Sequence, residues 1–331
     1  MFFTTPVGLP CGTLDISHRS KLLLIGSCFA GNIGAALLDK KFNADVNPFG
    51  VQYNPLSIAT VLSRIVDGTP FDAHSPELFE HNGKWHSILH HSDFSRNSKE
   101  QLIEGINERL LKAHKAIGEC DVIIITLGTA YAYTRNSDNA VAGNCHKLPA
   151  SCFTRSLLDI EEIVEKLRSA IQRIMAINPG IKFIFTVSPI RHLRDGAHDN
   201  QKSKGTLLLA IDRITEAFPE NTAYFPSYEI MMDELRDYRF YADDMLHPSA
   251  KAIEYIWECF DKCYFNDATR ALCAKTGEIT RGLAHRPFDP QSQDYIRFIE
   301  QLLQKIGTIG KEHPYIDFEN EKRQCNTLLD R

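Results

Sequence analysis

Residues 22–32 read Leu-Leu-Leu-Ile-Gly-Ser-Cys-Phe-Ala-Gly-Asn and form the most informative junction of the chain. The first four are continuously apolar, which is typical of a parallel strand buried on both faces. The residues that follow turn sharply into a helix whose inner face would hold Ile33 and Leu37. Ligands of open parallel sheets bind outside the carboxyl ends of the strands. Ser27 and Cys28 therefore stand where a sheet of this kind would present a nucleophile.

Outward from this junction, short apolar runs alternate with amphipathic helical patterns. Strands are expected at residues 21–26, 44–46, 122–127, 181–187 and 223–225. This alternation is the pattern of βαβ units. It predicts a three-layer α/β/α domain over residues 15–265, flavodoxin-like, with a doubly wound parallel sheet of about five strands.

Other segments depart from this alternation. Residues 70–96, rich in histidine and aromatics, and the polar residues 131–153 each follow a core element, so we expect loops that cover the strand ends. Residues 266–331 are expected to form a helical C-terminal extension that ends in a polar tail. One apolar face of this extension comprises Tyr295, Ile299, Leu302 and Ile306. A face of this size should dock on its own domain or form the seam of a homodimer.

The composition is that of a globular protein, with 331 residues, 43% of them hydrophobic, and a net charge of −5. No Lys/Arg block exceeds a few residues, which argues against a nucleic-acid partner. No apolar run is long enough to cross a membrane, and no signal peptide is visible. Nine cysteines are scattered without CxxC pairs, as expected in a reducing compartment. We therefore expect a cytoplasmic protein.

A second chemically suggestive motif lies far downstream, in Asp244-Met245-Leu246-His247-Pro248. The spacing lets the carboxylate of Asp244 fix one imidazole nitrogen of His247 while the other nitrogen faces a nucleophile. Pro248 then begins a helix, which limits how far the pair can move. The motif is common, and Asp244 could instead cap a turn. If the pair is functional, His247 should lie within hydrogen-bond reach, or one water, of Cys28.

With these motifs the chain resembles the GSCFA family, which is named for the pentapeptide Gly26 to Ala30 and is grouped with the SGNH (GDSL-like) hydrolases. The resemblance extends over residues 21–260. It also rests on later segments, namely residues 47–53, 127–133, 188–198 and 244–247. It implies an SGNH-like fold and an esterase, thioesterase or acyltransferase that acts on an acyl group of a small molecule or a carbohydrate.

The register of the resemblance favours Cys28 over Ser27 as the nucleophile. The common motif of these hydrolases is Gly-Asp-Ser, and alignment on Gly26 puts Cys28 in the place of the serine. A thiol near a histidine ionises readily and is a strong nucleophile. A shift of one residue would restore Ser27, and Cys28 could also be a small buried apolar residue at a tight turn. The resemblance makes Asp244 and His247 the orienting acid and the base.

The oxyanion-binding blocks of the superfamily match only in part. Gly50, in Asn47-Pro48-Phe49-Gly50, stands where the resemblance places a glycine whose N–H binds the oxyanion together with the N–H of Cys28. An ordinary turn at Asn47 is an equal alternative. The third block, Gly128-Thr129-Ala130, lacks the usual asparagine, so the hydroxyl of Thr129 is the candidate substitute.

Arg191 and His192 follow the fourth strand, in a run similar to that of GSCFA relatives, and would suit an anionic or sugar-like substrate. No metal or cofactor is expected, because the ligand spacing around His90 and His91 is unconvincing for zinc. Asn54 is explained as a helix cap. The alternative to an enzyme is a catalytically silent SGNH-like module that binds a glycan or an acyl ligand. The missing asparagine supports this alternative, and the intact Asp244/His247 pair opposes it.

Overall fold

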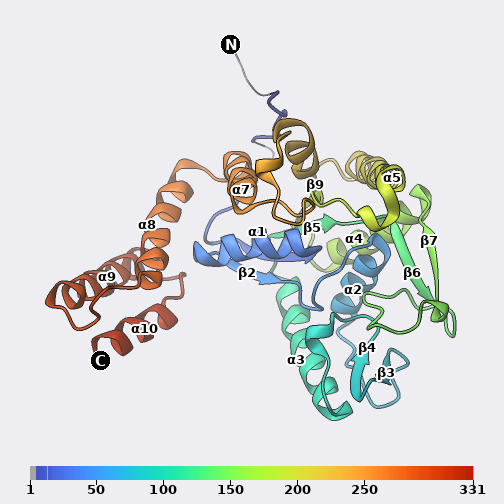
Figure 1. Cartoon of the computed structure of the whole chain (residues 1–331), viewed down its shortest axis with the longest axis horizontal. Coiled ribbons are helices and arrows are strands. Elements are labelled where there is room, and N and C mark those ends of the chain that lie inside the picture. The colour runs from blue at the N-terminus through green and yellow to red at the C-terminus, as the bar shows by residue number, and fades with distance from the viewer. Residues whose placement is uncertain (1–4, 13, 331) are drawn as a thin grey trace.

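The computed structural model describes residues 5–12 and 14–330, and a five-stranded sheet forms its centre (Figure 1). In spatial order the strands are β2 (Asn43–Val46), β1 (Lys21–Gly26), β5 (Val122–Leu127), β8 (Lys182–Val187) and β9 (Thr222–Tyr224). Every neighbouring pair is parallel. When the five strands of this sheet are numbered in chain order, their spatial order is 2-1-3-4-5, which is the flavodoxin-like strand order. The predicted doubly wound parallel sheet is confirmed.

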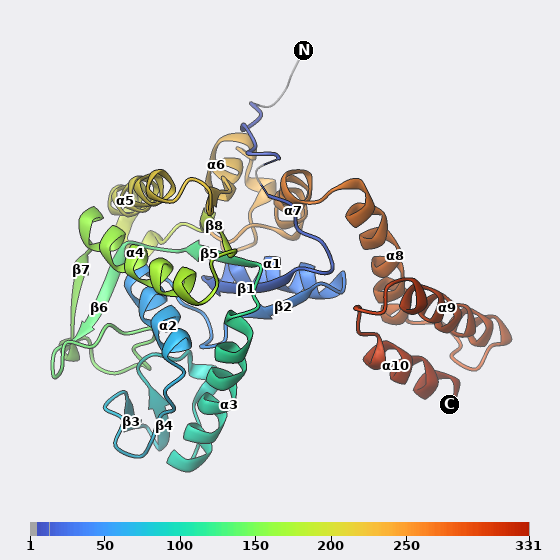
Figure 2. The ribbon, with the colours of Figure 1, turned by 180° about the vertical axis from the view of Figure 1, so that it is seen from behind.

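The alternation of side chains along β1 divides the core into two layers. Leu23 and Ile25 pack with helices α2 (Pro55–Asp67), α3 (Lys99–Ile117), α4 (Ile160–Ile177) and α5 (Gly196–Ala217). Leu22 and Leu24 pack with α1 (Cys28–Asp39) and α7 (Ala250–Tyr264). Figures 1 and 2 show these two groups of helices on opposite sides of the sheet. The predicted three-layer α/β/α arrangement is therefore confirmed as well.

Short polar side chains fix where the helices begin. Asn54 Oδ1 accepts a hydrogen bond from the N–H of Ser57 at 2.8 Å, and Pro55 occupies the first turn of α2. Ser98 Oγ accepts from the N–H of Gln101 at 3.2 Å and caps α3 in the same way. Each cap satisfies one N–H that the first turn of a helix leaves without a carbonyl partner.

Two antiparallel hairpins extend from the main sheet. The first pairs β3 (Leu78–His81) with β4 (Lys84–Ser87), within the histidine-rich insertion. The second pairs β6 (Tyr131–Arg135) with β7 (Phe153–Leu157) and carries the polar insertion between its strands. Both segments were expected as loops, and cross-strand pairing gives them regular structure instead. A short helix, α6 (Ser227–Glu229), follows β9.

The C-terminal part of the chain forms an arm of three helices: α8 (Asp267–Ala284), α9 (Gln293–Glu312) and α10 (Glu319–Leu329). The predicted apolar face of α9 is buried within this arm, where it packs with side chains of α8 and α10. It therefore docks inside the chain and is not left as a seam for a second copy. Thr276 Oγ1 on α8 donates to the carbonyl of Lys40 at 3.0 Å, and Lys41 Nζ lies 2.7 Å from Glu321 Oε1.

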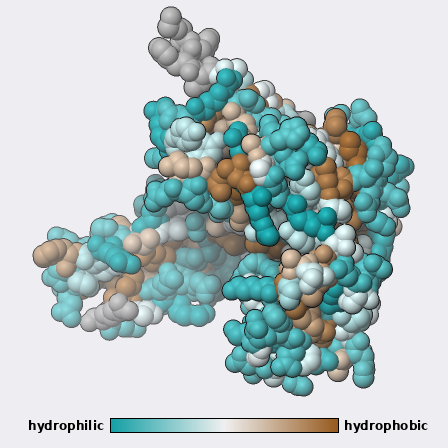
Figure 3. Space-filling view, turned by 45° about the vertical axis from the view of Figure 1, so that its right-hand side comes forward, coloured by the Kyte–Doolittle hydropathy of each residue, from teal (hydrophilic) through white to brown (hydrophobic). Residues whose placement is uncertain are grey.

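Figure 3 shows the arm standing away from the main body, with mostly hydrophilic residues on the visible faces of both. No helix within the described part of the chain is both long enough and apolar enough to cross a membrane.

Candidate functional site

The carboxyl end of β1 approaches its neighbour so closely that only a glycine fits. Gly26 has a φ of +152°, and a Cβ at this position would lie 2.2 Å from the carbonyl oxygen of Thr126 on β5. Ser27 follows as the N-cap of α1, and its Oγ accepts from the N–H of Phe29 at 3.3 Å. Ser27 is only 1% exposed, whereas Cys28, the first residue of α1, is half-buried.

A cavity of about 510 Å³ lies at this end of the sheet and brings distant segments together. The β1–α1 junction, the residues before α2, the residues after β5 and β8, the second hairpin and the loop before α7 all contribute to it. The polar and aromatic side chains that line it include Ser27, Cys28, Tyr53, Asn54, Thr129, Tyr131, Tyr133, Arg155, Arg191, His192, Arg194, Asp195 and His247.

The surroundings of Cys28 shift the pKa of its thiol in two opposite directions. Burial raises the pKa of the thiol, because the low-dielectric surroundings disfavour the thiolate. The backbone N–H groups of Phe29 and Cys28, and the ammonium group of Lys204, act in the opposite direction. The burial effect is the largest, so the resting group is a thiol that needs a base to ionise it.

Asp244 and His247 form the expected local pair. Asp244 Oδ2 lies 2.5 Å from His247 Nδ1, and Asp244 Oδ1 accepts from the N–H groups of Leu246 and His247, each at 2.9 Å. These two N–H groups, and then the imidazole, lower the pKa of Asp244 to about 2. The other ring nitrogen of His247 has no hydrogen-bond partner among the described residues, and the side chain is about half exposed.

Cys28 and His247 thus line one cavity, although the chain between them contains most of the domain. No hydrogen bond joins the Cys28 sulfur to the His247 ring within the described structure. In enzymes without substrate, such contacts are often long and shorten when the substrate binds. The arrangement provides an oriented imidazole and a partly accessible thiol on the same side of the sheet.

Gly50 and Asn47 lie outside this cavity. The N–H of Gly50 donates to the carbonyl of Asn47 at 2.7 Å, within a turn where Gly50 has a φ of +76°. This N–H is therefore committed to the turn and is not available to an oxyanion. Asn47 Oδ1 accepts from the N–H of Gly26 at 2.9 Å and so anchors the end of β1. The expected oxyanion role of Gly50 has no geometric support, and the turn interpretation describes both residues.

Thr129 lines the cavity, but its polar groups already have partners. Its N–H donates to the carbonyl of Tyr53 at 3.0 Å. Its Oγ1 lies 3.1 Å from Ser203 Oγ and accepts from the N–H of Tyr131 at 3.1 Å. The hydroxyl is therefore held in a network, which limits its use as a free donor to a substrate.

Asn54 has a second feature that the sequence did not reveal. While its Oδ1 caps α2, its side chain also lines the cavity, and its Nδ2 has no hydrogen-bond partner in the described part of the chain. The cap fixes the plane of the amide, so the N–H groups point away from the helix backbone. Asn54 Nδ2 is therefore a candidate hydrogen-bond donor to a ligand in the cavity.

Lys204 is a further residue near this site that was not singled out from the sequence. It lies on α5, is 1% exposed, and its Nζ donates to the carbonyls of Gly128 at 2.7 Å and Ser188 at 2.8 Å. These carbonyls follow β5 and β8. Burial lowers the pKa of Lys204 to about 7, while the nearby Cys28 sulfur acts in the opposite direction. One signal was available in the sequence: Lys204 shares the apolar stripe of Leu207 and Ile211.

Arg191 and His192 both line the cavity, as does Arg155 from the second hairpin. Burial is the main cause that lowers the pKa of His192 to about 4, and the charges of Lys204, His247 and Arg155 add to it. His192 is therefore neutral at physiological pH. Arg155 forms an ion pair with Asp195, and its guanidinium carbon lies 3.8 Å from the centre of the Tyr131 ring.

His90, which follows β4 in the histidine-rich insertion, serves packing. His90 is fully buried, its ring stacks on Phe49 with centroids 4.2 Å apart, and its Nδ1 lies 2.8 Å from Ser87 Oγ. Burial lowers the pKa of His90 to about 3, so the ring is neutral. Within residues 5–12 and 14–330, no three His, Cys, Asp or Glu side chains gather in a way that could hold a metal ion.

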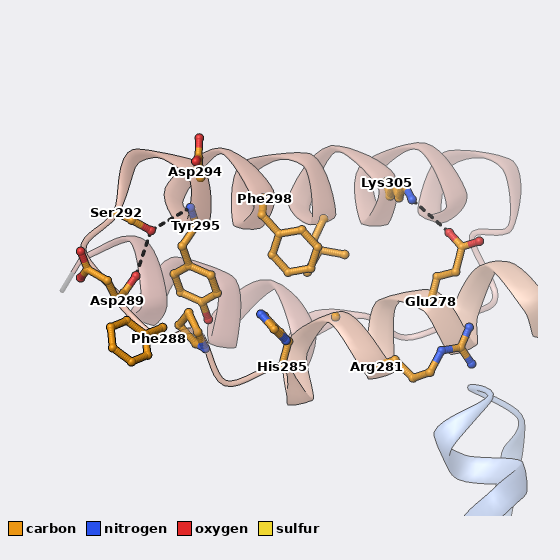
Figure 4. Close-up of a pocket in the computed structure, with 13 residues that line it drawn as sticks. Glu278, Arg281, His285, Phe288, Asp289, Ser292, Asp294, Tyr295, Phe298 and Lys305 are labelled. Atoms are coloured by element: carbon orange, nitrogen blue, oxygen red, sulfur yellow. Dashed lines mark hydrogen bonds and ion pairs between the residues drawn. The ribbon is translucent and has the colours of Figure 1, made fainter.

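A second cavity, of about 750 Å³, lies between α8 and α9 (Figure 4). Its lining includes Arg281, His285 and Phe298 but no cysteine. The hydroxyl of Ser292 donates to the carbonyl of Asp289 at 2.9 Å and accepts from the N–H of Tyr295 at 3.3 Å. This cavity therefore has no pairing of nucleophile and base comparable to that at the end of the sheet.

The chain is thus a doubly wound α/β/α protein with a cysteine and an Asp–His pair in one cavity at the carboxyl edge of its sheet. The chain belongs to the GSCFA family. The model of that family matches residues 21–260, and a second model, described as the GSCFA domain protein C-terminal domain, matches residues 277–331. The family resemblance stated from the sequence is confirmed.

No curated protein matches the chain. Among solved structures, it is similar to an acetyl xylan esterase (Est2A) from the rumen bacterium Butyrivibrio proteoclasticus, with 14% sequence identity and a TM-score of 0.37. The similarity covers 75% of this chain and 64% of the esterase chain, which is less than two thirds of the latter.

Proposed function

We propose that the protein is an acyl hydrolase or acyltransferase of the esterase or thioesterase type, with Cys28 as its nucleophile. The observation that carries this proposal is the shared cavity. It brings the half-buried Cys28 together with His247, whose Nδ1 is held by Asp244 and whose Nε2 is unpaired among the described residues. Ser27 is a weaker candidate because its hydroxyl caps α1 and is almost fully buried.

In this mechanism His247 Nε2 takes the proton of the Cys28 thiol, and the sulfur attacks the acyl carbon of the substrate. The imidazolium that forms is stabilised by Asp244. Collapse of the tetrahedral intermediate breaks the bond to the leaving alkoxide or thiolate, which takes the proton from His247. The acyl group is then a thioester on Cys28. Water, or an acceptor hydroxyl, loses a proton to His247 and attacks the carbonyl carbon of the thioester. The second intermediate collapses by breaking the C–S bond, the Cys28 thiolate takes the proton back from His247, and the acid or the new ester leaves.

The oxyanion of the intermediate would be bound by the N–H of Cys28, which opens α1, together with the Nδ2 of Asn54. The N–H groups of the first helical turn lack carbonyl partners within the helix, so they favour a developing negative charge. Lys204 would add a buried positive charge to the same region. The N–H of Cys28 and the Nδ2 of Asn54 would replace the N–H of Gly50, which already donates to the carbonyl of Asn47.

The test uses short-chain aryl esters and thioesters with the purified full chain. Wild type is expected to turn them over, and Cys28→Ala and His247→Ala to abolish turnover while the fold is retained. Ser27→Ala is the matched control: it should lose about 1 kcal/mol of stability as a helix cap and keep its activity. An acyl adduct on Cys28, detected by mass spectrometry, would identify the nucleophile. Loss of activity in Ser27→Ala but not in Cys28→Ala would reverse the assignment.

A second candidate function is a catalytically silent module that binds an acyl or glycan ligand. It is favoured by the raised pKa of the Cys28 thiol and by the absence of a Cys28–His247 hydrogen bond in the described structure. This candidate predicts no turnover of any ester and unchanged ligand binding in Cys28→Ala. Labelling of Cys28 that is no faster or more pH-dependent than that of the other cysteines would support it.

A further inference from the structure

Two of the three arginines that line the candidate cavity, Arg191 and Arg194, have no carboxylate partner among the described residues. Arg155 has an ion-pair partner, Asp195. Arg191 donates from Nε to the sulfur of Met232 at 3.0 Å and has no ion pair with a carboxylate in the described structure. Arg194 also lines the cavity and has neither a hydrogen bond nor an ion pair with any described residue. Burial raises the pKa of the Cys145 thiol, another lining group, and the nearby charge of Arg194 opposes this rise.

The interior of the cavity has the same sign of charge. Lys204 is buried beside Cys28 and has only carbonyl oxygens as hydrogen-bond acceptors. Burial is the main cause that lowers the pKa of His192, and the charges of Lys204, His247 and Arg155 lower it further. These three basic side chains therefore lie close to His192. The chain as a whole carries a net charge of −5, so this local excess is not a general property of its surface.

We propose that the ligand of this cavity carries an oxyanion group, a carboxylate or a phosphate, which binds to Arg191 and Arg194. The planar guanidinium group offers paired N–H donors that match the geometry of both anions. Burial of two unpaired arginines against an anion would satisfy donors that now face solvent. The identification of this anion as part of an acyl substrate rests on the proposed function, whereas the binding of the anion itself does not.

The experiment compares two alkylating reagents with the same leaving group, iodoacetate (anionic) and iodoacetamide (neutral). Rates are measured at single cysteines of the intact full-length protein by peptide mass spectrometry. The ratio of the iodoacetate rate to the iodoacetamide rate should be about tenfold higher at Cys28 than at the exposed Cys11, because a cationic cavity concentrates anions. The excess should fall as the salt concentration rises.

The double variant Arg191→Gln/Arg194→Gln should bring the ratio at Cys28 down towards that at Cys11. Arg168→Gln, on the exposed side of α4, removes one positive charge away from the cavity and should leave the ratio unchanged. Protection of Cys28 by acetate or by inorganic phosphate distinguishes the two anions. Equal ratios at Cys28 and Cys11, or a ratio that the double variant does not change, would overturn the proposal.

If Cys28 reacts too slowly with both reagents, the shift of the thermal unfolding temperature by inorganic phosphate and by acetate gives the second measurement. Wild type and the Arg168→Gln variant should be stabilised by at least one of the two anions, and the double variant should not be. No stabilisation of wild type by either anion would also overturn the proposal. Turnover is not measured here, so an inactive protein that still prefers iodoacetate would refute the proposed reaction and leave the anion site standing.

Discussion

Ser27 and Cys28 are neighbours in the sequence with different environments. The hydroxyl of Ser27 satisfies the first turn of α1, and the side chain of Cys28 is left half-buried at the cavity. The difference arises because the N-cap residue turns its side chain back over the helix end. A helix N-terminus also stabilises negative charge, which is the direction in which the N–H groups of Phe29 and Cys28 move the pKa of the thiol.

The side-chain amide of Asn54 caps α2 through Oδ1 and is the proposed oxyanion donor through Nδ2, and a substitution can separate these two roles. Asn54→Ser keeps an oxygen that can cap α2 but removes Nδ2. Turnover by this variant should fall about a hundredfold to a thousandfold, as is usual when one oxyanion donor is lost. The free energy of unfolding, measured in urea, should change by less than about 1 kcal/mol. If turnover falls only a few-fold, Asn54 is a cap and nothing more.

The buried Lys204 should make stability depend on pH. Its pKa in the fold is about 7, below the ordinary value of 10.5, so above pH 7 the folded chain has released a proton that the unfolded chain retains. Stability from this group is therefore reduced below pH 7 and rises as the pH increases towards 10.5.

Lys204→Met should remove this rise. The measurement is the free energy of unfolding at pH 7 and pH 9 in wild type, in Lys204→Met and in the exposed control Lys166→Met. The control should keep the wild-type difference between the two pH values. The same difference in Lys204→Met would show that the ammonium is retained in the fold at both pH values.

At the scale of elements, the contact between α8 and α9 depends on a glycine. A Cβ at Gly282 would lie 2.8 Å from both terminal methyl carbons of Leu302 and 3.3 Å from the Phe298 ring. The two helices therefore approach more closely than they could with any other residue at this position. Gly307, on α9, has no heavy atom within 4 Å of such a Cβ.

The two glycines should respond to alanine in opposite ways. Gly282→Ala should destabilise the arm by about 1–3 kcal/mol, since packed methyl groups must move. Gly307→Ala should stabilise it by up to about 1 kcal/mol, because alanine is the better helix former. Thermal unfolding followed by circular dichroism would measure both. Equal effects of the two substitutions would contradict the close approach.

At the scale of the whole molecule, the core consists of three clusters. Two of them cover the faces of the sheet, and the third lies within the arm. Helix α8 links the second and third clusters, since Cys273 belongs to one and Ile279 to the other. The lining of the candidate site comes only from residues 27–247, so no residue of the arm contributes to it.

Loss of packing in the arm should therefore remain local. Ile299→Ala, in the third cluster, should cost about 2–5 kcal/mol of local stability and increase amide hydrogen exchange in α9 and α10. Exchange in β1 and β5, and the alkylation rate of Cys28, should not change. Ile125→Ala on β5 is the matched substitution, and it should increase exchange throughout the sheet. Increased exchange in β1 after Ile299→Ala would show that the chain unfolds as one unit.

The sequence by itself determined the elements and the local pair. Apolar runs identify β1, β5 and β8 as strands buried on both faces. The shorter β2 and β9 are partly polar, and their prediction rested on the alternation of strand and helix patterns. Asp244 and His247 are three residues apart, and their hydrogen bond depends only on the loop between them. The position of Cys28 at the end of β1 follows from the same local pattern.

The tertiary structure decided what surrounds Cys28. Lys204 reaches the site because the strand order places the end of β5 between those of β1 and β8. Arg155 comes from β7, a strand that the sequence patterns did not predict. For Gly50 the sequence left an oxyanion role and an ordinary turn open, and the structure favours the turn because the N–H of Gly50 donates to the carbonyl of Asn47. Local patterns are set by the spacing of a few residues, whereas the neighbours of a side chain depend on which distant segments the fold packs together.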